Sequence, residues 1–264
     1  MRLGGVFDHI GLGFHRYSTD KRWFLPHFEK MLYDQAMLSM AYLEAYQLTG
    51  NEKYAQVARE IFTYVLRDMT HKDGGFYSAE DADSEGEEGV FYIWTKEELI
   101  EILGPEDGTR MAKIFGFSDN GNFRDEASGK STGNNIPYLP RSKDELAKKS
   151  GMSLDEFDGF VEMSRQQLFD VREKRIHPLK DDKILTDWNG LMIAALALGG
   201  QVLDEPDYIT AAERAAGFVE KNLRDKKGRL MKRYRLGKAG LSPHLDDYSF
   251  MVWGLLNLYE ATFD

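Results

Sequence analysis

Residues 4–34 combine side chains that can exchange protons with side chains that can form an apolar wall. The stretch holds three of the six histidines, seven aromatic residues and four glycines. An imidazole changes its charge near neutral pH, and aromatic rings beside titratable groups are typical of ligand sites. Glycine also lets the backbone approach a ligand closely. We therefore expect residues 4–34 to form the floor or rim of a site.

His27 is the first candidate for acid–base chemistry. It follows Pro26 near the start of a long predicted helix, with Glu29 two residues further on. A histidine in this position can act as general base or general acid. The alternative is a structural histidine packed at a helix start. His244, two residues before Asp246, precedes a later predicted helix and is the second candidate.

The elements that would position these residues form an internal repeat. Residues 35–48 are apolar on nearly every side, which is typical of a fully buried helix, and residues 52–67 carry one apolar stripe. The same order returns after Asp187, and a third copy begins at Asp247. The sequence therefore predicts an all-α fold of inner and outer helices, with short β hairpins between them. The third copy stops after one helix, so we expect these residues to be a piece of a larger protein.

Alternating inner and outer helices place all inner helices in the same direction. Their N-terminal ends, which carry partial positive charge and free N–H groups, should then gather at one mouth. Asp34, Asp187 and Asp247 occupy equivalent positions at these ends. The simplest interpretation is that they cap the helices or offset the helix dipole.

Composition excludes several classes of function. The formal charge is −10 and the acidic and basic residues are interspersed, which argues against a nucleic-acid partner. The absence of cysteine excludes disulfides and thiol nucleophiles. The longest apolar run, residues 190–200, is too short to cross a membrane, and no signal pattern opens the chain. We expect a soluble, cytoplasmic protein without a membrane partner.

No motif predicts a cofactor or a metal. Residues 81–86 imitate the start of a calcium loop, but Tyr92 stands where the bidentate glutamate is needed. The histidines lack metal-binding spacing, and neither a phosphate-binding loop nor a nucleophile elbow is present. We therefore expect neither a cofactor nor a metal ion.

Four long motifs, taken together, resemble the spermatogenesis-associated protein 20 family, which includes bacterial YyaL-like proteins. They read GFHRYSTDKRWFLPHFEKMLYDQA, DADSEGEEGVFYIWT, RIHPLKDDKILTDWNGLMIAALA and HLDDYSFMVWGLLNLYEAT. The resemblance implies an (α/α) helical-hairpin toroid, similar to six-hairpin glycosidases and N-acylglucosamine 2-epimerase-like proteins. Family members also carry an N-terminal thioredoxin-like domain, which this chain lacks. Residues 1–264 are thus expected to form a single, incomplete toroid domain.

The resemblance also suggests a carbohydrate-active domain with three possible functions. By analogy with epimerase-like toroids, His27 and His244 would move a proton at a sugar carbon beside a carbonyl. A glycosidase-like reaction would instead use Asp34 or Asp247 as general acid. The third possibility is a non-catalytic scaffold whose partner is the thioredoxin-like domain.

A sugar would need stacking surfaces and hydrogen-bonding groups at the same mouth. Aromatic rings can stack on a sugar, although they more often pack in the core. An amide can bind hydroxyl groups, and an arginine can hold an anionic group at two points. The residues expected to contact a sugar are Arg16, Trp23, Glu29, Tyr33, Asp187, Trp188 and Asn189.

Overall fold

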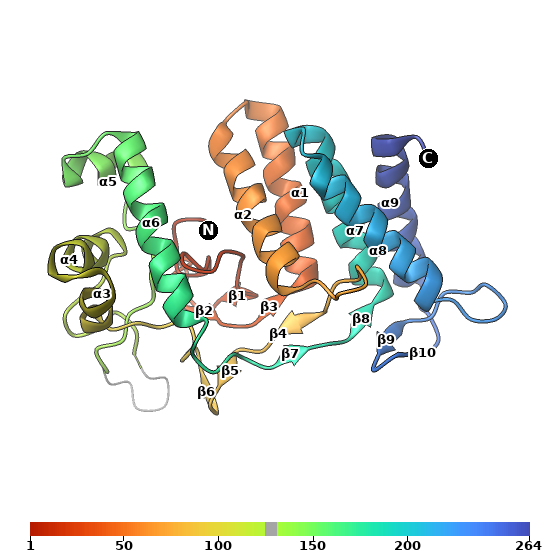
Figure 1. Cartoon of the computed structure of the whole chain (residues 1–264), viewed down its shortest axis with the longest axis horizontal. Helices are drawn as coiled ribbons and strands as arrows, with labels where there is room; N and C mark the ends of the chain where they lie inside the picture. Colours follow the sequence, from red (N-terminus) through yellow and green to blue (C-terminus); the bar gives the residue numbers. More distant parts are fainter. Residues whose placement is uncertain (125–130) are drawn as a thin grey trace. The chain divides into compact units, whose positions relative to one another are not determined.

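The computed structural model describes residues 1–124 and 131–264 (Figure 1). The chain forms two compact units. Residues 1–29 and 81–179 make the first unit, and residues 30–80 and 180–264 make the second. The single domain expected over residues 1–264 stays a prediction.

The second unit consists of helical hairpins. Helices α1 (Leu32–Thr49) and α2 (Glu52–Asp68) form the first hairpin, and α7 (Thr186–Leu203) and α8 (Pro206–Asn222) form the second. Helix α9 (Leu245–Thr262) begins the third copy. The predicted helices and their order are confirmed, and the fold belongs to the predicted (α/α) hairpin class (Figure 1).

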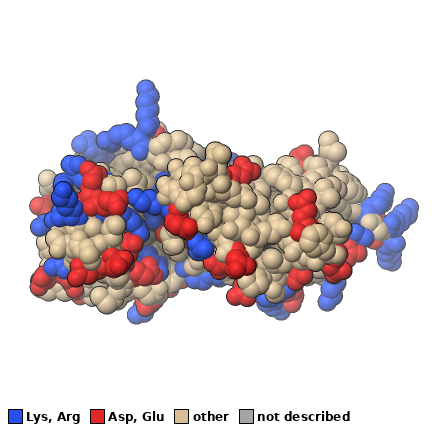
Figure 2. All heavy atoms as spheres, turned by 90° about the horizontal axis from the view of Figure 1, so that it is seen from above, with Lys and Arg blue, Asp and Glu red and all other residues tan. Residues whose placement is uncertain are grey.

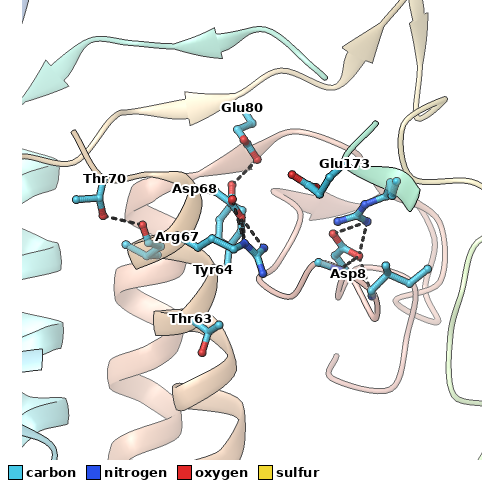
Figure 3. A network of polar contacts seen from close by, with 12 residues as sticks. Asp8, Thr63, Tyr64, Arg67, Asp68, Thr70, Glu80 and Glu173 are labelled. Carbon is cyan, nitrogen blue, oxygen red and sulfur yellow. Dashed lines mark hydrogen bonds and ion pairs between the residues drawn. The ribbon is translucent and has the colours of Figure 1, made fainter. Parts of the chain in front are cut away.

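Short antiparallel strands connect the helices of the second unit. One sheet has the order β3–β4–β7 and the other has the order β10–β9–β8. The strands are β3 (Lys30–Met31), β4 (Ala79–Glu80), β7 (Lys180–Asp181), β8 (Ile184–Leu185), β9 (Arg233–Arg235) and β10 (Lys238–Gly240). In the first sheet, Tyr64 of α2 donates a hydrogen bond to Glu80 of β4 at 2.7 Å (Figure 3).

The turn that follows the outer helix makes the same backbone hydrogen bond in the first two copies of the repeat. The carbonyl of Ser78 accepts from the N–H of Leu32 at the start of α1, at 2.9 Å. At the equivalent place, the carbonyl of Lys232 accepts from the N–H of Thr186 at the start of α7, at 3.1 Å. Each turn therefore satisfies one of the free N–H groups at an inner-helix start.

Helix α7 is the centre of the second unit. Fourteen of its eighteen residues are buried, and it packs against α1, α8 and α9. The contact with α9 depends on two glycines, because a Cβ on Gly190 would lie 2.5 Å from the carbonyl carbon of Phe250. A Cβ on Gly254 would lie 2.5 Å from the carbonyl oxygen of Gly190. The two helix backbones thus approach to a distance that leaves no room for a side chain.

The first unit contains four helices among its described residues. They are α3 (Lys96–Leu103), α4 (Pro105–Ile114), α5 (Lys143–Ser150) and α6 (Leu154–Arg172). Helices α3, α5 and α6 each begin with a capping box, formed by Thr95 with Glu98, Ser142 with Glu145 and Ser153 with Glu156. Apolar side chains of these helices form one cluster around Trp94, Phe115 and Phe157. The unit also has two short hairpins, β1 (Tyr17–Ser18) with β2 (Pro26–His27) and β5 (Asp83–Ser84) with β6 (Glu87–Glu88).

A buried ion pair holds the N-terminal loop of the first unit. Nη1 of Arg172 lies 2.9 Å from both carboxylate oxygens of Asp8. Asp8 also accepts hydrogen bonds from the N–H groups of Ile10 and Gly11 (Figure 3). Burial alone would lower the pKa of Arg172, but the charge and hydrogen bonds of Asp8 raise it. Asp8 therefore has the extra hydrogen bonds that a buried charge requires, whereas Nε of Arg172 is buried without a hydrogen-bond partner among the described residues.

His9 and His15, two of the three histidines in residues 4–34, are structural. The ring of His15 bonds the carbonyl of Phe28 at 2.9 Å and is 3% exposed. His9 lies with Nε2 3.0 Å from the carbonyl of Gly4 and Nδ1 3.1 Å from Arg2. A carbonyl can only accept, so Nε2 carries a proton. An arginine can only donate, so Nδ1 carries none and the ring is neutral. Burial first, and the charge of Arg2 second, lower the pKa of His9 to about 3.

Among the described residues, no helix combines the length and the apolar character that a membrane span requires.

Substituting Gly190 tests the close contact of α7 and α9. Gly190→Ala should lower the free energy of unfolding by about 1–3 kcal/mol, because the new methyl group forces the helices apart. Gly217→Ala is the matched control, since its Cβ on α8 would meet no atom within 4 Å. It should raise stability by about 0.5–1 kcal/mol. Denaturant unfolding measures both; equal effects would contradict the close packing.

His9 should make the first unit sensitive to acid. Its folded pKa is lower than that of an unfolded histidine, so the unfolded chain binds the additional proton below pH 6.5. The free energy of unfolding should therefore fall with decreasing pH from 6.5 toward 3, by up to about 1.4 kcal/mol per pH unit. His9→Gln should remove this part of the slope. Urea unfolding at several pH values measures it, and a parallel slope in the variant would refute the assignment.

Candidate functional site

The N-terminal ends of α1, α7 and α9 lie together in the second unit. The rings of Tyr33 on α1 and Trp188 on α7 meet edge to face, with centroids 4.8 Å apart. The N–H of Asp187 on α7 donates to Oδ1 of Asp247 on α9 at 3.2 Å. The gathering of inner-helix ends predicted from the repeat is thus observed for these three helices. Asp34 lies in the first turn of α1 and is partly buried.

Lys232 joins Asp187 and Asp247 in a buried ionic cluster. Its Nζ lies 2.5 Å from Oδ2 of Asp187 and 3.3 Å from Oδ1 of Asp247. Burial opposes the charge of Lys232, but the hydrogen bond and charge of Asp187, followed by the charge of Asp247, raise its pKa. The carboxylates also serve the backbone, since Asp187 accepts from Trp188 N–H and Asp247 from His244 N–H. The bond of Asp247 to the N-cap residue of α9 is a capping contact, whereas Asp187 lies in the first turn of α7, whose N-cap has no side-chain cap hydrogen bond.

Asn189 and Trp188 differ in how available their side chains are. The amide of Asn189 is fully buried; it accepts from the N–H of Phe76 and donates to the carbonyls of Phe76 and Leu185. Both of its N–H donors therefore already bind the backbone. Trp188 and its neighbour Tyr33 are partly exposed, so their rings stay available for a ligand.

The predicted histidine pair falls in two different units. His244 belongs to the second unit, where it is exposed and precedes the first residue of α9. His27 belongs to the first unit. A joint action of His27 and His244 stays a prediction.

His27 lies between two carboxylates of the first unit. Its Nδ1 is 2.7 Å from Oε1 of Glu88, and its Nε2 is 3.3 Å from Oε2 of Glu29. Glu88 is itself held by the N–H of Phe28 at 3.0 Å, and the ring of Tyr17 stacks on the imidazole with centroids 4.9 Å apart. The pairing of strands β1 and β2 places Tyr17 opposite His27. This arrangement fixes the ring and directs its two nitrogens toward different acids.

The remaining candidates of the first unit have different surroundings. Arg16 lies beside the same cluster, with Nη1 2.9 Å from Oε2 of Glu29. Trp23 is 45% exposed and has a φ of 62°, and its carbonyl accepts from the N–H of Val6. The structure therefore joins Arg16, Glu29 and His27 in one group, and it records no contact of the Trp23 ring with them among the described residues.

A cavity of about 910 Å³ in the first unit is lined by Glu88, the partner of His27, although His27 itself is not a lining residue. The lining includes Pro26 and Phe28, the neighbours of His27 in sequence, and its partner Glu88. The wall combines aromatic rings, carboxylates, cations and neutral polar groups, contributed by Phe91, Phe123, Glu85, Glu87, Glu98, Lys174, Arg175, Thr95 and Asn134. Nη2 of Arg175 is paired with Glu98 at 2.9 Å. Volumes of about 300–1,000 Å³ with mixed walls are typical of small-molecule sites.

Sequence reasoning missed Glu88 and Lys232. Glu88 lies 61 residues from His27 in the chain, and no local pattern connects an acidic hairpin to a distant imidazole. Lys232 follows Gly228 by four residues, as Ser78 follows Gly74, so the repeat marks its position. A lysine replaces the serine at this repeat position, and an acid begins the next helix. This change was the sequence signal that could have predicted the ion pair.

The described residues contain no group of three or more histidine, aspartate or glutamate side chains arranged to hold a metal ion.

Lys232 is expected to be essential for the helix ends of the second unit. Lys232→Met leaves two buried carboxylates without their cation and should lower the free energy of unfolding by about 3–5 kcal/mol. Lys238→Met, on the exposed strand β10, should change it by less than about 0.5 kcal/mol. Denaturant unfolding of both variants measures the difference.

The free energy of unfolding at alkaline pH supplies a second measurement on the same variant. The folded pKa of Lys232 is raised above the ordinary 10.5, so the folded chain holds this proton more tightly than the unfolded chain. The contribution of the cluster is complete below pH 10.5 and is lost as pH rises above it. This part of the loss should be absent in Lys232→Met, and an unchanged alkaline slope would contradict the ionic role.

Known proteins show where the chain belongs. No family model matches the chain. It is 40% identical to human spermatogenesis-associated protein 20 over 289 aligned residues, which cover 99% of this chain and 37% of the human protein. The chain thus spans little more than a third of that relative.

Two solved structures are similar at low sequence identity. The unsaturated glucuronyl hydrolase of Bacillus sp. GL1 is 13% identical, with a TM-score of 0.47 over 98% of this chain and 46% of that one. Cellobiose 2-epimerase of Spirochaeta thermophila is 15% identical, with a TM-score of 0.28 over 97% and 77% of the two chains. The family assignment rests on the sequence match, which confirms the resemblance of the motifs: over practically its whole length, this chain is a homologue of the spermatogenesis-associated protein 20 family.

Proposed function

We propose that the first unit binds a sugar in the cavity beside His27 and isomerises it by acid–base chemistry. The observation that carries the proposal is that His27 lies between Glu88 and Glu29, and that Glu88 also lines the cavity. The family resemblance to carbohydrate-active helical domains supports the substrate class. The size of the cavity suits a monosaccharide, and its aromatic rings and polar groups suit the two faces and the hydroxyls of such a ring.

The contacts of His27 divide its two nitrogens between two roles. Nδ1 donates its proton to Glu88, which orients the ring and stabilises the imidazolium that forms during proton transfer. Nε2 then removes a proton from the carbon beside the sugar carbonyl, and the electron pair forms an enediol. The same imidazolium returns the proton to the neighbouring carbon. Glu29, adjacent to Nε2 and held by Arg16, carries the hydroxyl proton between the two oxygens.

A single base suits isomerisation between an aldose and a ketose better than epimerisation. Isomerisation moves the proton between adjacent carbons on one face of the enediol, which one imidazole can reach. Epimerisation requires the proton to return to the opposite face of the same carbon, so it requires a second donor. His244 would be that donor in the pair suggested by the sequence.

Deuterium exchange tests the proton transfer directly. The protein is incubated in D2O with a panel of aldoses and ketoses, and proton NMR follows exchange at the carbon beside the carbonyl and formation of the isomer. His27→Gln should reduce exchange about 100-fold or more, within the range of general-base contributions. Glu88→Gln, which keeps a hydrogen-bonding side chain but removes the charge, should reduce it less.

His71→Gln is the matched control, because His71 also lies near a carboxylate, with Nδ1 3.7 Å from Asp73, but belongs to the second unit. Its exchange rate should equal that of the unchanged protein. New reducing ends without deuterium at carbon would indicate a hydrolase. Sugar binding without exchange would indicate the non-catalytic scaffold, whose thioredoxin-like partner the family resemblance suggests. Equal exchange in His27→Gln would refute the proposed base.

A further inference from the structure

A second hollow of the first unit has the opposite charge to the rest of the chain. Its volume is about 640 Å³, and it lies between α4 and α5 and the segment before α5. Four cationic side chains and one acid line it: Arg110, Lys113, Arg141, Lys149 and Glu106. Over the face shown in Figure 2, acidic and basic side chains are interspersed, and the whole chain carries −10. The lining side chains alone have a net excess of three positive charges, which Asp107 and Glu145, the acids paired with Arg110 and Arg141, reduce to one.

The four cations divide into two held side chains and two available ones. Arg110 is fixed on its own helix, 3.1 Å from Glu106 and 3.5 Å from Asp107, and Arg141 lies 3.7 Å from Glu145. Lys113 and Lys149 are exposed, and neither has a recorded ion pair within the part of the chain that the structure describes. The arginines thus form a fixed rim, and the lysines can close on a ligand.

The helix dipole accounts for part of this pattern. Lys113 and Lys149 lie in the last turns of α4 and α5, where a cation offsets the partial negative charge of the helix end. The ion pairs with nearby acids account for the two arginines. The dipole does not require the two last turns to face one hollow, and the convergence of their lysines points to a ligand.

The uncharged part of the wall defines that ligand further. Thr109 and Ser150 supply hydroxyl groups, and the apolar surface comes from Pro105, Ile114, Pro140 and Leu146. Hydroxyl and ammonium donors match the oxygens of a phosphate or sulfate group, and the apolar surface matches the face of a ring. The volume suits a molecule of that size, whereas a protein partner requires an interface of about 800 Å² per side.

We propose that this hollow is a binding site for a small ring compound that bears a phosphate or sulfate ester. Lys113 and Lys149 bind the ester oxygens, Arg110 and Arg141 set the positive potential, and the ring lies on the apolar surface. The site is formed within the first unit by residues other than those of the His27 cavity. It is therefore independent of the proposed isomerase activity.

Calorimetric titration of the whole chain tests this site. The probes are glucose 6-phosphate, glucose 6-sulfate, glucose and inorganic phosphate. We expect both esters to bind more tightly than phosphate alone, and glucose not to bind at the site. The double variant Lys113→Gln/Lys149→Gln should weaken ester binding at least tenfold. Rising salt should weaken binding in the unchanged protein and have less effect in the variant.

Lys226→Gln/Lys227→Gln is the matched control, because it removes two exposed lysines from a turn of the second unit. It should leave ester affinity unchanged. Equal weakening in the two double variants would overturn the site, as would absence of ester binding at millimolar concentration. Tighter binding of an acidic peptide than of either ester would also overturn it, because the hollow would then serve a protein partner. The relative affinity of the two esters identifies the anion.

Discussion

The second unit depends on one constraint, which is that α7 has no polar side. A helix that is apolar all round is stable in water only when other elements cover it in every direction. In this chain α1, α8 and α9 provide the cover. The close approach of α9 at Gly190 and Gly254 and the gathering of three helix ends follow from this packing. The arrangement of the polar groups at these ends is therefore a consequence of burying α7.

Gathering helix ends brings acids and free N–H groups into a buried place, where each must find a partner. Lys232, Asp187 and Asp247 satisfy one another and the adjacent backbone, and the carbonyls of the turns after α2 and α8 satisfy the starts of α1 and α7. A carboxylate with this many fixed donors is well suited to capping and poorly suited to exchanging protons with a ligand. His27 has the opposite character, since it is partly exposed and its partners are acids that accept protons.

Periodic features were predictable from the sequence because they depend on residues close together in the chain. The hairpin helices and the capping boxes of α3, α5 and α6 are of this kind. The expected equivalence of the three acids is only approximate, because Asp34 and Asp247 are the third residues of their helices and Asp187 is the second residue of α7. Contacts between distant residues were not predictable. His27 and Glu88 belong to two separate hairpins and meet through a side-chain contact, and Asn189 binds the backbone of a turn 113 residues away. Burial was not predictable either. His9 and His15 are buried and His27 is partly exposed, although all three lie within residues 4–34.

The contrast between the two groups of acids decides how substitutions are to be interpreted. Removing Asp187 or Asp247 leaves the partly buried Lys232 without one of its two carboxylates, so a loss of activity would arise from lost structure. Removing the charge of Glu88 leaves a partly exposed hairpin residue, so the fold should tolerate it and the proton chemistry should not. A carboxylate is informative about catalysis only where its removal leaves the fold intact. By this criterion the acids beside His27, rather than the acids at the helix ends, are the residues whose variants report on function.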